Sequence, residues 1–443
     1  YSLGVDGLSI PMVILTPLLC FLSVFVSWKI DRAVKGYFAL FLLLDTGMIG
    51  VFLALDFFLF YVFWEVMLLP MYFLIGMWGG PQREYAAIKF FLYTLVGSVL
   101  MLIAVIALYL NCGKTFDIPT LMETAQTDLD GVLWWGFSAI KIIWILLFIG
   151  FAIKVPIFPF HTWLPLAHVE APTAISVILA GVLLKMGTYG LLRISYPLLP
   201  GEVVNFSYIL AVLGVINIIW GAVNAIAQID MKKMVAYSSV SHMGYVLLGM
   251  AAAISESSAG AQAGMNGAVM QMFNHGTITA MLFLLVGMVY DRAHHRWIIF
   301  PRDYEKPELA GQPGFGGIGA QVPIYTGFVA LAFFAGLGLP ALSGFISEAM
   351  CFIGGFSAFR TLTIIGTLGI LLNAIYFLRA YQRIFLGPLN ETYKDLTDIN
   401  KIELATIVPL AIITLVLGVY PAPLLNMIAP AMDGIIQIVQ SAL

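Results

Sequence analysis

Charge is scarce in this chain of 443 residues, because Asp, Glu, Lys and Arg together make up only 10% of it. A soluble domain carries about 25% charged residues, so the sequence excludes an assembly of two or three soluble domains. The net charge of −3 provides no basic surface for nucleic acid. The three cysteines, Cys20, Cys112 and Cys351, form no CxxC or Cys/His spacing. We therefore predict neither a metal site nor an iron–sulfur cluster.

Apolar residues dominate instead, at 61% of the chain. A membrane-spanning helix takes about 20 residues, so this content is enough for on the order of a dozen spans. We therefore predict an all-α, polytopic membrane protein without a soluble catalytic or nucleotide-binding domain. No charged n-region or small-residue cleavage site precedes the first apolar run, so we expect no signal peptide.

The apolar runs predict about twelve transmembrane helices. They lie near 4–28, 36–55, 57–79, 86–110, 133–160, 171–195, 206–228, 231–253, 264–290, 322–357, 361–388 and 403–427. The tenth run is too long for one straight span and contains Gly-Leu-Gly-Leu-Pro at 336–340. We therefore expect one broken helix there.

Loop charges test this topology, because cytoplasmic loops are enriched in Lys and Arg. Most of the 21 lysines and arginines lie in alternate loops: Lys29, Arg32, Lys35, Arg83, Lys232, Lys233, Arg292, Arg296, Arg302, Lys306, Arg379, Arg383, Lys394 and Lys401. The intervening loops carry only Lys114, Arg193 and Arg360. This alternation predicts that both ends of the chain lie outside.

Glu65 and Lys185 stand out because a charge near mid-bilayer costs about 2.5–3.5 kcal/mol on insertion scales. Glu65 lies nine residues from Asp56, which places it about 14 Å deep in a helix. The alternative for Glu65 is a structural role, in which its carboxylate bonds to a neighbouring helix. Lys185 lies mid-span, too far from either end to reach water by snorkelling. We favour a proton-transfer role for both residues.

Lys154 and Glu348 each lie beside a predicted break in a helix. Lys154 precedes Pro156 and Pro159, and broken helices at membrane depth mark ion pathways in transporters. Snorkelling to the cytoplasmic edge is an equally good interpretation of Lys154. Glu348 follows Pro340, and the alternative is a helix N-cap. Glu348 lies too far after Pro340 for an N-cap, which favours a functional role for its carboxylate.

Histidines occur in the same spans, and histidine can relay protons near neutral pH. His242 and His275 lie near the middle of adjacent spans, where a relay and a simple packing role are equally plausible. His161 and His168 flank the entrance of the sixth span and are weaker candidates. Titratable groups recur in six spans in all, which favours a proton path over isolated structural charges.

The chain also divides into two similar blocks of five spans, 36–195 and 206–388. Residues 1–35 hold the first span and 389–443 the last. Because five is odd, the second block enters the membrane from the opposite side, as in inverted-repeat transporters. The fourth helix of each block is broken beside a titratable residue, Lys154 or Glu348. We expect two half-channels open to opposite sides, with Lys185 near their junction.

Five motifs resemble those of the antiporter-like subunits of respiratory complex I, NADH-quinone oxidoreductase. They lie at 60–80, 154–173, 179–193, 236–244 and 344–348. They include Phe-Trp-Glu-Val-Met-Leu-Leu-Pro, Lys-Val-Pro-Ile-Phe-Pro-Phe-His and Ala-Tyr-Ser-Ser-Val-Ser-His-Met-Gly. The chain is most similar to the M type, the counterpart of mitochondrial NADH dehydrogenase subunit four, because Glu348 stands where other types typically carry lysine. Relatives usually have fourteen spans, so two are expected to precede those predicted here.

The resemblance implies that Glu65 pairs with Lys154 and modulates its proton affinity. It implies that Lys185 is the central relay and that Glu348 leads to the outward exit. His242 and His275 would connect the two halves, and His161 is a weaker relay candidate.

These observations lead to the hypothesis of a proton-translocating membrane-arm subunit. The subunit belongs to an enzyme, the NADH:quinone oxidoreductase translocase, and carries no redox centre or cofactor. NADH, FMN, iron–sulfur clusters and quinone would be bound by other subunits. Its partners would be the other antiporter-like subunits, the rest of complex I and the lipid bilayer, with no nucleic acid. It would lie in a bacterial inner membrane or an organellar energy-transducing membrane. The alternatives are a subunit of a multisubunit cation/proton antiporter or of a membrane-bound hydrogenase, and a passive spacer.

Overall fold

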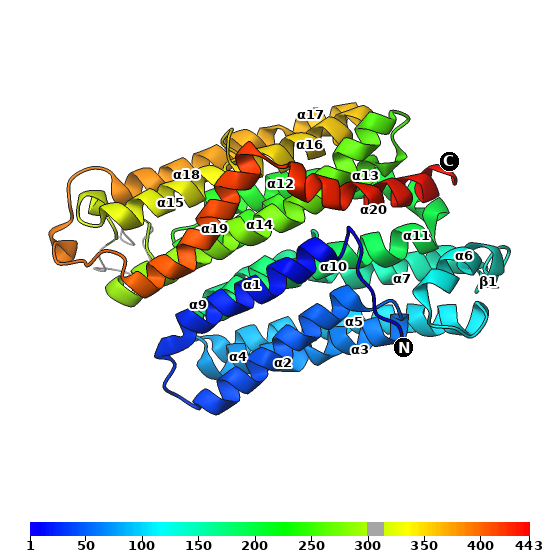
Figure 1. The fold of residues 1–443 in the computed structure, drawn as a ribbon, viewed down its shortest axis with the longest axis horizontal. Coiled ribbons are helices and arrows are strands. Elements are labelled where there is room, and N and C mark those ends of the chain that lie inside the picture. Colours follow the sequence, from blue (N-terminus) through cyan, green and yellow to red (C-terminus); the bar gives the residue numbers. More distant parts are fainter. Residues whose placement is uncertain (299–313) are drawn as a thin grey trace.

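The computed structural model describes residues 1–298 and 314–443, and the predicted loop cations Arg302 and Lys306 lie outside these ranges. Long helices run side by side along the molecule (Figure 1). In the described ranges the only strands are β1 (Leu133–Trp134) and β2 (Phe137–Ser138), which form a small antiparallel hairpin. The predicted all-α, polytopic class is therefore confirmed.

The first part of the chain, up to residue 198, holds eleven of the numbered α-helices among the residues described. They are α1 (Ile10–Val26), α2 (Val34–Leu53), α3 (Phe57–Val66), α4 (Leu68–Trp78), α5 (Arg83–Asn111), α6 (Ile118–Asp128), α7 (Ala139–Lys154), α8 (Leu164–Glu170), α9 (Thr173–Ile178), α10 (Leu184–Gly190) and α11 (Tyr196–Leu198). The short helices are η1 (Ser27–Lys29) and η2 (Phe160–Trp163), both 3-10, and η3 (Leu179–Leu183) and η4 (Leu191–Ser195), both π-helical.

The second part contains the helices that surround the predicted second break. They are α12 (Pro200–Ile226), α13 (Met231–Ala251), α14 (Ser258–Ala293), α15 (Pro323–Gly336), α16 (Ser343–Ala358), α17 (Arg360–Gly366), α18 (Leu368–Phe385), α19 (Lys401–Val419) and α20 (Ala422–Gln440). The short 3-10 helices are η5 (Ala252–Ile254), η8 (Ile318–Ala320) and η9 (Glu391–Tyr393).

Ten helices in the described ranges are long and apolar enough to cross a membrane. The run predicted at 133–160 is helical only over α7, whose 16 residues are short for a span. The run at 322–357 is interrupted where predicted, between α15 and α16. Helix α20 is a further candidate span that the hydropathy pattern did not single out. The number twelve therefore stays a prediction.

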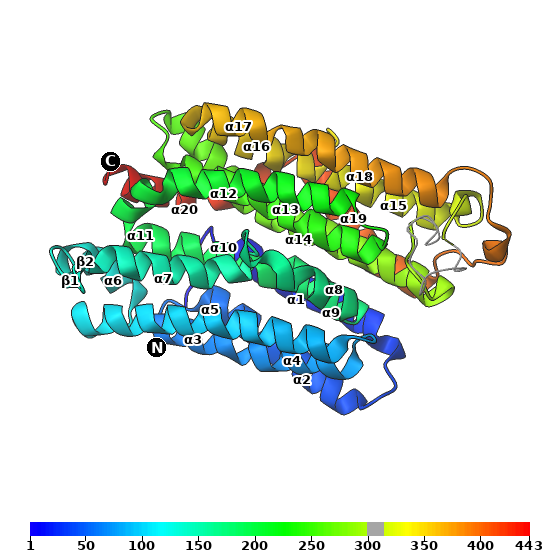
Figure 2. The same cartoon turned by 180° about the vertical axis from the view of Figure 1, so that it is seen from behind.

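The helices form two groups with a layer between them. Helices α2 to α5 lie on one side, and α12 to α18 lie on the other (Figures 1 and 2). Helix α1 and the segment from α9 to α11 lie between the groups. The middle segment Thr173–Leu198 is buried except at Thr173 and Arg193, which are partly exposed, whereas peripheral helices such as α18 expose Leu371 and other large apolar side chains. Both termini lie at the end that carries the β1–β2 hairpin (Figure 1), as expected for termini on one side of the membrane.

Helices α14 and α16 pack unusually closely through glycines. A Cβ atom added to Gly354 would lie 2.3 Å from the Cα atom of Gly264. Small residues of this kind let helix backbones approach each other in membranes. The close contact holds α16, which carries Glu348, against α14, which carries His275.

We expect Gly354→Ala to lower the stability of the bundle by about 1–3 kcal/mol, because the added methyl group must separate two backbones. Thermal unfolding of the purified protein in detergent measures this loss. Gly327→Ala in α15 is the matched control, since no described atom lies within 4 Å of the position of its Cβ. Equal midpoints for the two variants would contradict the close packing.

Candidate proton-transfer site

Lys185 lies in α10, at the centre of the buried middle segment. Its side chain has no exposed surface, so the snorkelling alternative is wrong. The Lys185 Nζ atom donates a hydrogen bond to the carbonyl oxygen of Ala180 and lies 2.6 Å from the Nδ1 atom of His275. Ala180 belongs to the π-helical turn η3, where the usual backbone pairing is shifted. The turn thus supplies an acceptor for the buried ammonium group.

His275 connects Lys185 to the second half of the molecule. Its ring centroid lies 5.5 Å from that of His242, and its Nε2 atom has no hydrogen-bond partner among the described residues. The Nε2 atom of His242 in turn lies 3.5 Å from the Oε1 atom of Glu348. Lys185, His275, His242 and Glu348 therefore form one row of buried titratable groups.

His242 lies where the second helix is broken. Its Nε2 atom lies 2.8 Å from the carbonyl oxygen of Gly336, the last residue of α15, and its Nδ1 atom lies 2.7 Å from the Ser238 carbonyl. A neutral imidazole can donate to only one of these acceptors, whereas the imidazolium can donate to both. The site can therefore hold His242 with one proton or with two.

The segment between α15 and α16 brings backbone close to the carboxylate of Glu348. Gly338 has a φ of +79°, and a Cβ atom there would lie 2.7 Å from the Glu348 Oε2 atom. Glycine therefore suits this position in both conformation and space. Glu348 is the sixth residue of α16, which begins at Ser343, and no side chain caps that helix. The N-cap alternative for Glu348 is therefore wrong.

A second polar network fixes α16 against α14 beside this row. The Asn274 Nδ2 atom donates to the Ser343 carbonyl (2.8 Å) and to the Ser347 hydroxyl (3.1 Å). The Ser347 hydroxyl donates to the Oε1 atom of Gln271 at 2.5 Å. Asn274 precedes His275 and Ser347 precedes Glu348 in sequence, and hydropathy did not reveal their contacts. They help to hold the two titratable groups in register.

Lys154 ends α7, at the first helix break. The side-chain amide of Asn217, in α12, accepts from the Phe158 N–H (2.8 Å) and donates to the Pro156 carbonyl (3.3 Å). These bonds satisfy backbone groups that the break leaves free. The Lys154 side chain is only 2% exposed, which contradicts the snorkelling alternative. Its Nζ atom lies 5.1 Å from the ring centroid of Trp64.

Glu65 lies one residue after Trp64, and its Oε1 atom is buried without a partner among the described residues. Glu65 is close enough to Lys154 to interact with it electrostatically. The ion pairs found between described residues do not include these two groups. The structure therefore places Glu65 and Lys154 as neighbours, with the ammonium group over the indole ring.

The first break also packs against the helix of Lys185. A Cβ atom on Gly187 would lie 2.6 Å from the Cγ2 atom of Val155, the residue after Lys154. A shift of the backbone at the first break would therefore displace α10.

The candidate His161 and three further titratable residues are less central. The His161 Nε2 atom accepts a hydrogen bond from the Trp220 indole at 3.0 Å, and its Nδ1 atom has no partner in the described part of the chain. Lys141 is exposed in the first turn of α7, and Lys89 lies 5.8 Å from the ring centroid of Tyr93. Asp45 is partly buried, with its Oδ1 atom unpartnered in the residues described. None of these groups contacts the row around Lys185.

Two residues gain importance from the structure. His168 is fully buried, and neither ring nitrogen has a hydrogen-bond partner in the described ranges. Lys232, taken from the sequence as a loop cation, is only 5% exposed and donates to the Ala171 carbonyl at 2.5 Å. The run Met-Lys-Lys before an apolar segment is typical of a loop, so the sequence carried no signal for the burial of Lys232.

A helical bundle with two interrupted helices and a buried row of titratable groups is typical of ion-translocating membrane proteins. Similarity to known proteins identifies the family of ion-translocating proteins to which the chain belongs. The chain belongs to the NADH:quinone oxidoreductase/Mrp antiporter transmembrane family, whose pattern matches residues 54–373. It is an integral protein of an energy-transducing membrane.

Relatives and solved structures agree with this family. NADH-quinone oxidoreductase subunit M of Rhodobacter capsulatus is 43% identical over 442 residues, which cover 99% of this chain and 82% of that protein. A chain of respiratory complex I from Thermus thermophilus has a TM-score of 0.85 and 29% identity, covering 99% of this chain and 86% of that one. A chain of the Mrp complex from Dietzia sp. DQ12-45-1b shares the fold, with a TM-score of 0.80, 22% identity and coverage of 98% and 86%. The predicted resemblance to M-type subunits is confirmed.

Proposed function

We propose that the chain is a membrane-arm subunit of an NADH-quinone oxidoreductase and that it translocates protons. NADH oxidation and quinone reduction would take place on other subunits, which would bind the FMN, the iron–sulfur clusters and the quinone. The similarity to subunit M over nearly the whole chain supports this assignment. Its partners would be the other antiporter-like subunits of the membrane arm.

The observation that carries the proposal is the row from Lys185 to Glu348. An amine, two imidazoles and a carboxylate lie in sequence within the bundle, and each is buried. Burying four such groups without function would be costly, because each loses its hydration. A row of groups that can each bind and release one proton is what proton transfer through a membrane requires.

Transfer along the row needs three steps. The Lys185 ammonium gives a proton to Nδ1 of His275, which lies 2.6 Å away, and becomes a neutral amine. The proton on Nε2 of His275 then passes to His242 across the 5.5 Å between ring centroids, through water. The His242 imidazolium finally protonates the Glu348 carboxylate, 3.5 Å away, which releases the proton outward. Each step moves one proton. After the second step His275 carries its proton on Nδ1, so a ring rotation or a tautomer exchange through water must restore the Nε2–H form before Lys185 can transfer again.

Glu65 and Lys154 would couple this row to the rest of the complex. If Lys154 turned from the Trp64 ring towards Glu65, its charge would be neutralised locally, which would weaken its field in the neighbouring helix of Lys185. Movement in the opposite direction would push the proton from Lys185 towards His275. The contact between Val155 and Gly187 offers a mechanical connection for the same event.

The two blocks, 36–195 and 206–388, would form half-channels that open to opposite sides. Each contains a helix break that a polar side chain of a neighbouring helix satisfies: Asn217 at the first break and His242 at the second. This parallel favours an inverted repeat, with Lys185 near the junction of the blocks.

A subunit of a multisubunit cation/proton antiporter is the alternative, since the Mrp chain has the same fold. Purification of the chain with its native partners distinguishes a subunit of NADH-quinone oxidoreductase from a subunit of a cation/proton antiporter. We expect flavin- and iron–sulfur-containing subunits in the assembly and NADH-driven proton uptake into proteoliposomes. Sodium-dependent proton exchange by an assembly without redox subunits would contradict the proposal.

A further inference from the structure

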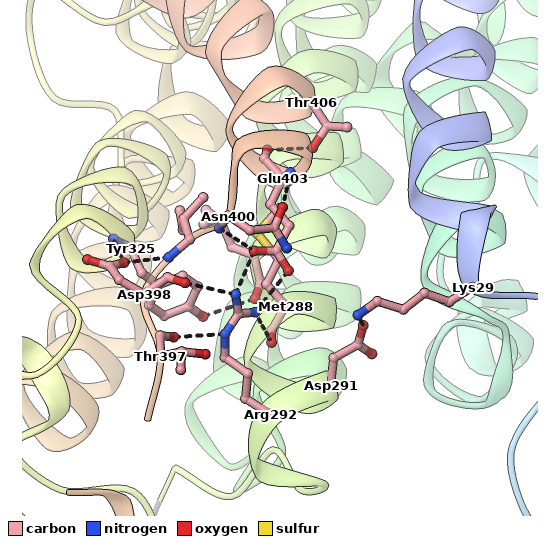
Figure 3. A network of polar contacts seen from close by, with 12 residues as sticks. Lys29, Met288, Asp291, Arg292, Tyr325, Thr397, Asp398, Asn400, Glu403 and Thr406 are labelled. Carbon is pink, nitrogen blue, oxygen red and sulfur yellow. Dashed lines mark hydrogen bonds and ion pairs between the residues drawn. The ribbon is translucent and has the colours of Figure 1, made fainter. Parts of the chain in front are cut away.

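A large cavity opens at the cation-rich end of the bundle, which the loop charges predict to face the cytoplasm. Its volume is about 610 Å³, and it lies between the two groups of helices. Charged residues that line it are Lys29, Glu170, Lys232, Asp291, Arg296 and Glu403. Figure 3 shows Lys29 reaching across to Asp291, with an Nζ to Oδ2 distance of 3.0 Å. We call this cavity the vestibule.

The vestibule is suited to water. Its charged groups are of both signs and offer donors and acceptors to water, although apolar side chains such as Trp28 and Ile402 also line it. Arg292 and Glu403 form a bidentate ion pair beside it (Figure 3), which fixes α14 against α19. The opening is therefore held by a rigid polar frame.

The floor of the vestibule is the short break between α8 and α9. The Lys232 Nζ atom donates to the carbonyl oxygens of Ala171 (2.5 Å) and Val169 (3.5 Å). Arg296 donates to the same Val169 carbonyl at 3.2 Å and pairs with Asp230 at 3.0 Å. Lys232 and Arg296 thus bond the backbone carbonyls on either side of Glu170.

Glu170 lies between Val169 and Ala171 in the chain and places a carboxylate near Lys232. Its Oε2 atom accepts the Gln82 N–H at 2.9 Å, and its carbonyl accepts the Gly80 N–H at 2.8 Å. Glu170 and Lys232 interact electrostatically but form no ion pair in the described ranges. A buried ammonium that bonds carbonyls while a carboxylate lies nearby has two competing positions.

His168 lies directly beneath the closed break. Its ring stacks on that of Phe283, with centroids 4.5 Å apart, and the Ser176 hydroxyl donates to its carbonyl at 3.0 Å. It lies close enough to both Lys232 and Lys185 to interact with them electrostatically. Neither of its two ring nitrogens has a hydrogen-bond partner among the described residues, so each could accept or donate a bond to water.

We propose that the vestibule is the entrance through which water and protons reach the Lys185 row, and that Lys232 is the positioning residue that gates it. While Lys232 holds the carbonyls of Val169 and Ala171, the break is closed. When Lys232 swings to Glu170, the carbonyls become hydrated and water reaches His168. This inference rests on the proposed function, but the gate can be tested without proton pumping.

Cysteine accessibility in membranes that contain the assembled complex tests the gate. Thr173→Cys lies in the wall of the vestibule, and Ser176→Cys lies behind the break. We expect a membrane-impermeant methanethiosulfonate reagent added on the cytoplasmic side to modify Thr173→Cys readily. It should modify Ser176→Cys at least tenfold more slowly. The native cysteines are buried, and the parent protein sets the baseline.

Adding Lys232→Met should raise the rate at Ser176→Cys at least tenfold and leave Thr173→Cys unchanged. Lys29→Met, which removes another lysine of the same cavity, should change neither rate, and Lys232→Arg should keep the break closed. Lys232→Gln provides a second open variant if Lys232→Met does not assemble. An unreactive Thr173→Cys, or a Ser176→Cys rate independent of Lys232, would overturn the proposal. Failure of NADH-driven pumping with these labelling results intact would refute only the proposed function.

Discussion

Replacing Lys185 by methionine should lower NADH-driven proton transfer through this subunit by at least about 100-fold, the usual scale for losing a positioned proton-transfer group. Methionine fills a similar volume but cannot carry the proton that Lys185 passes to His275. Proton uptake by proteoliposomes containing the intact complex measures the loss.

Lys141→Met is the matched control for this substitution. Lys141 is exposed in the first turn of α7 and contacts none of the buried groups of the row. It should retain near-normal translocation. Normal uptake in Lys185→Met, or equal losses in both variants, would mean that Lys185 is not a relay.

Glu348→Gln should reduce proton transfer through this subunit by at least about 100-fold as well, because the amide cannot take up the proton that arrives through His242. The shape of the site and its contact with Gly338 would be retained, so assembly should be normal. Glu348→Asp keeps a carboxylate on a shorter side chain and should recover part of the activity.

Glu256→Gln, in the exposed loop before α14, is the control for this carboxylate. It removes one negative charge far from the row and should leave translocation unchanged. If Glu348→Gln translocated protons at the rate of Glu256→Gln, the exit from His242 would have to use another group.

Much of the fold could be predicted because a bilayer imposes strong rules on sequence. Long apolar runs and alternating loop charges predict the helices and their direction. The break before Glu348 was visible because proline and glycine interrupt an apolar run. Helix α20 was missed because its apolar run contains Asp433 and follows closely on α19.

The individual site residues could be predicted because charge in a membrane is rare and costly. The contacts between these residues could not be predicted from the sequence. The bond between Lys185 and His275 joins residues 90 positions apart, and Asn217 reaches the first break from a different helix. The π-helical turns η3 and η4 flank α10, and the hydropathy pattern does not mark them. Lys232 was misjudged because local composition cannot distinguish an exposed loop cation from one folded back onto carbonyls.

The proton-to-electron ratio of the reconstituted complex tests the central claim most directly. NADH oxidation and proton uptake are measured together in proteoliposomes of the parent, Lys185→Met and Lys141→Met. We predict that Lys185→Met translocates fewer protons per electron or loses both activities together, while Lys141→Met matches the parent. A normal rate of NADH oxidation with an unchanged ratio in Lys185→Met would contradict proton transfer along the row from Lys185 to Glu348.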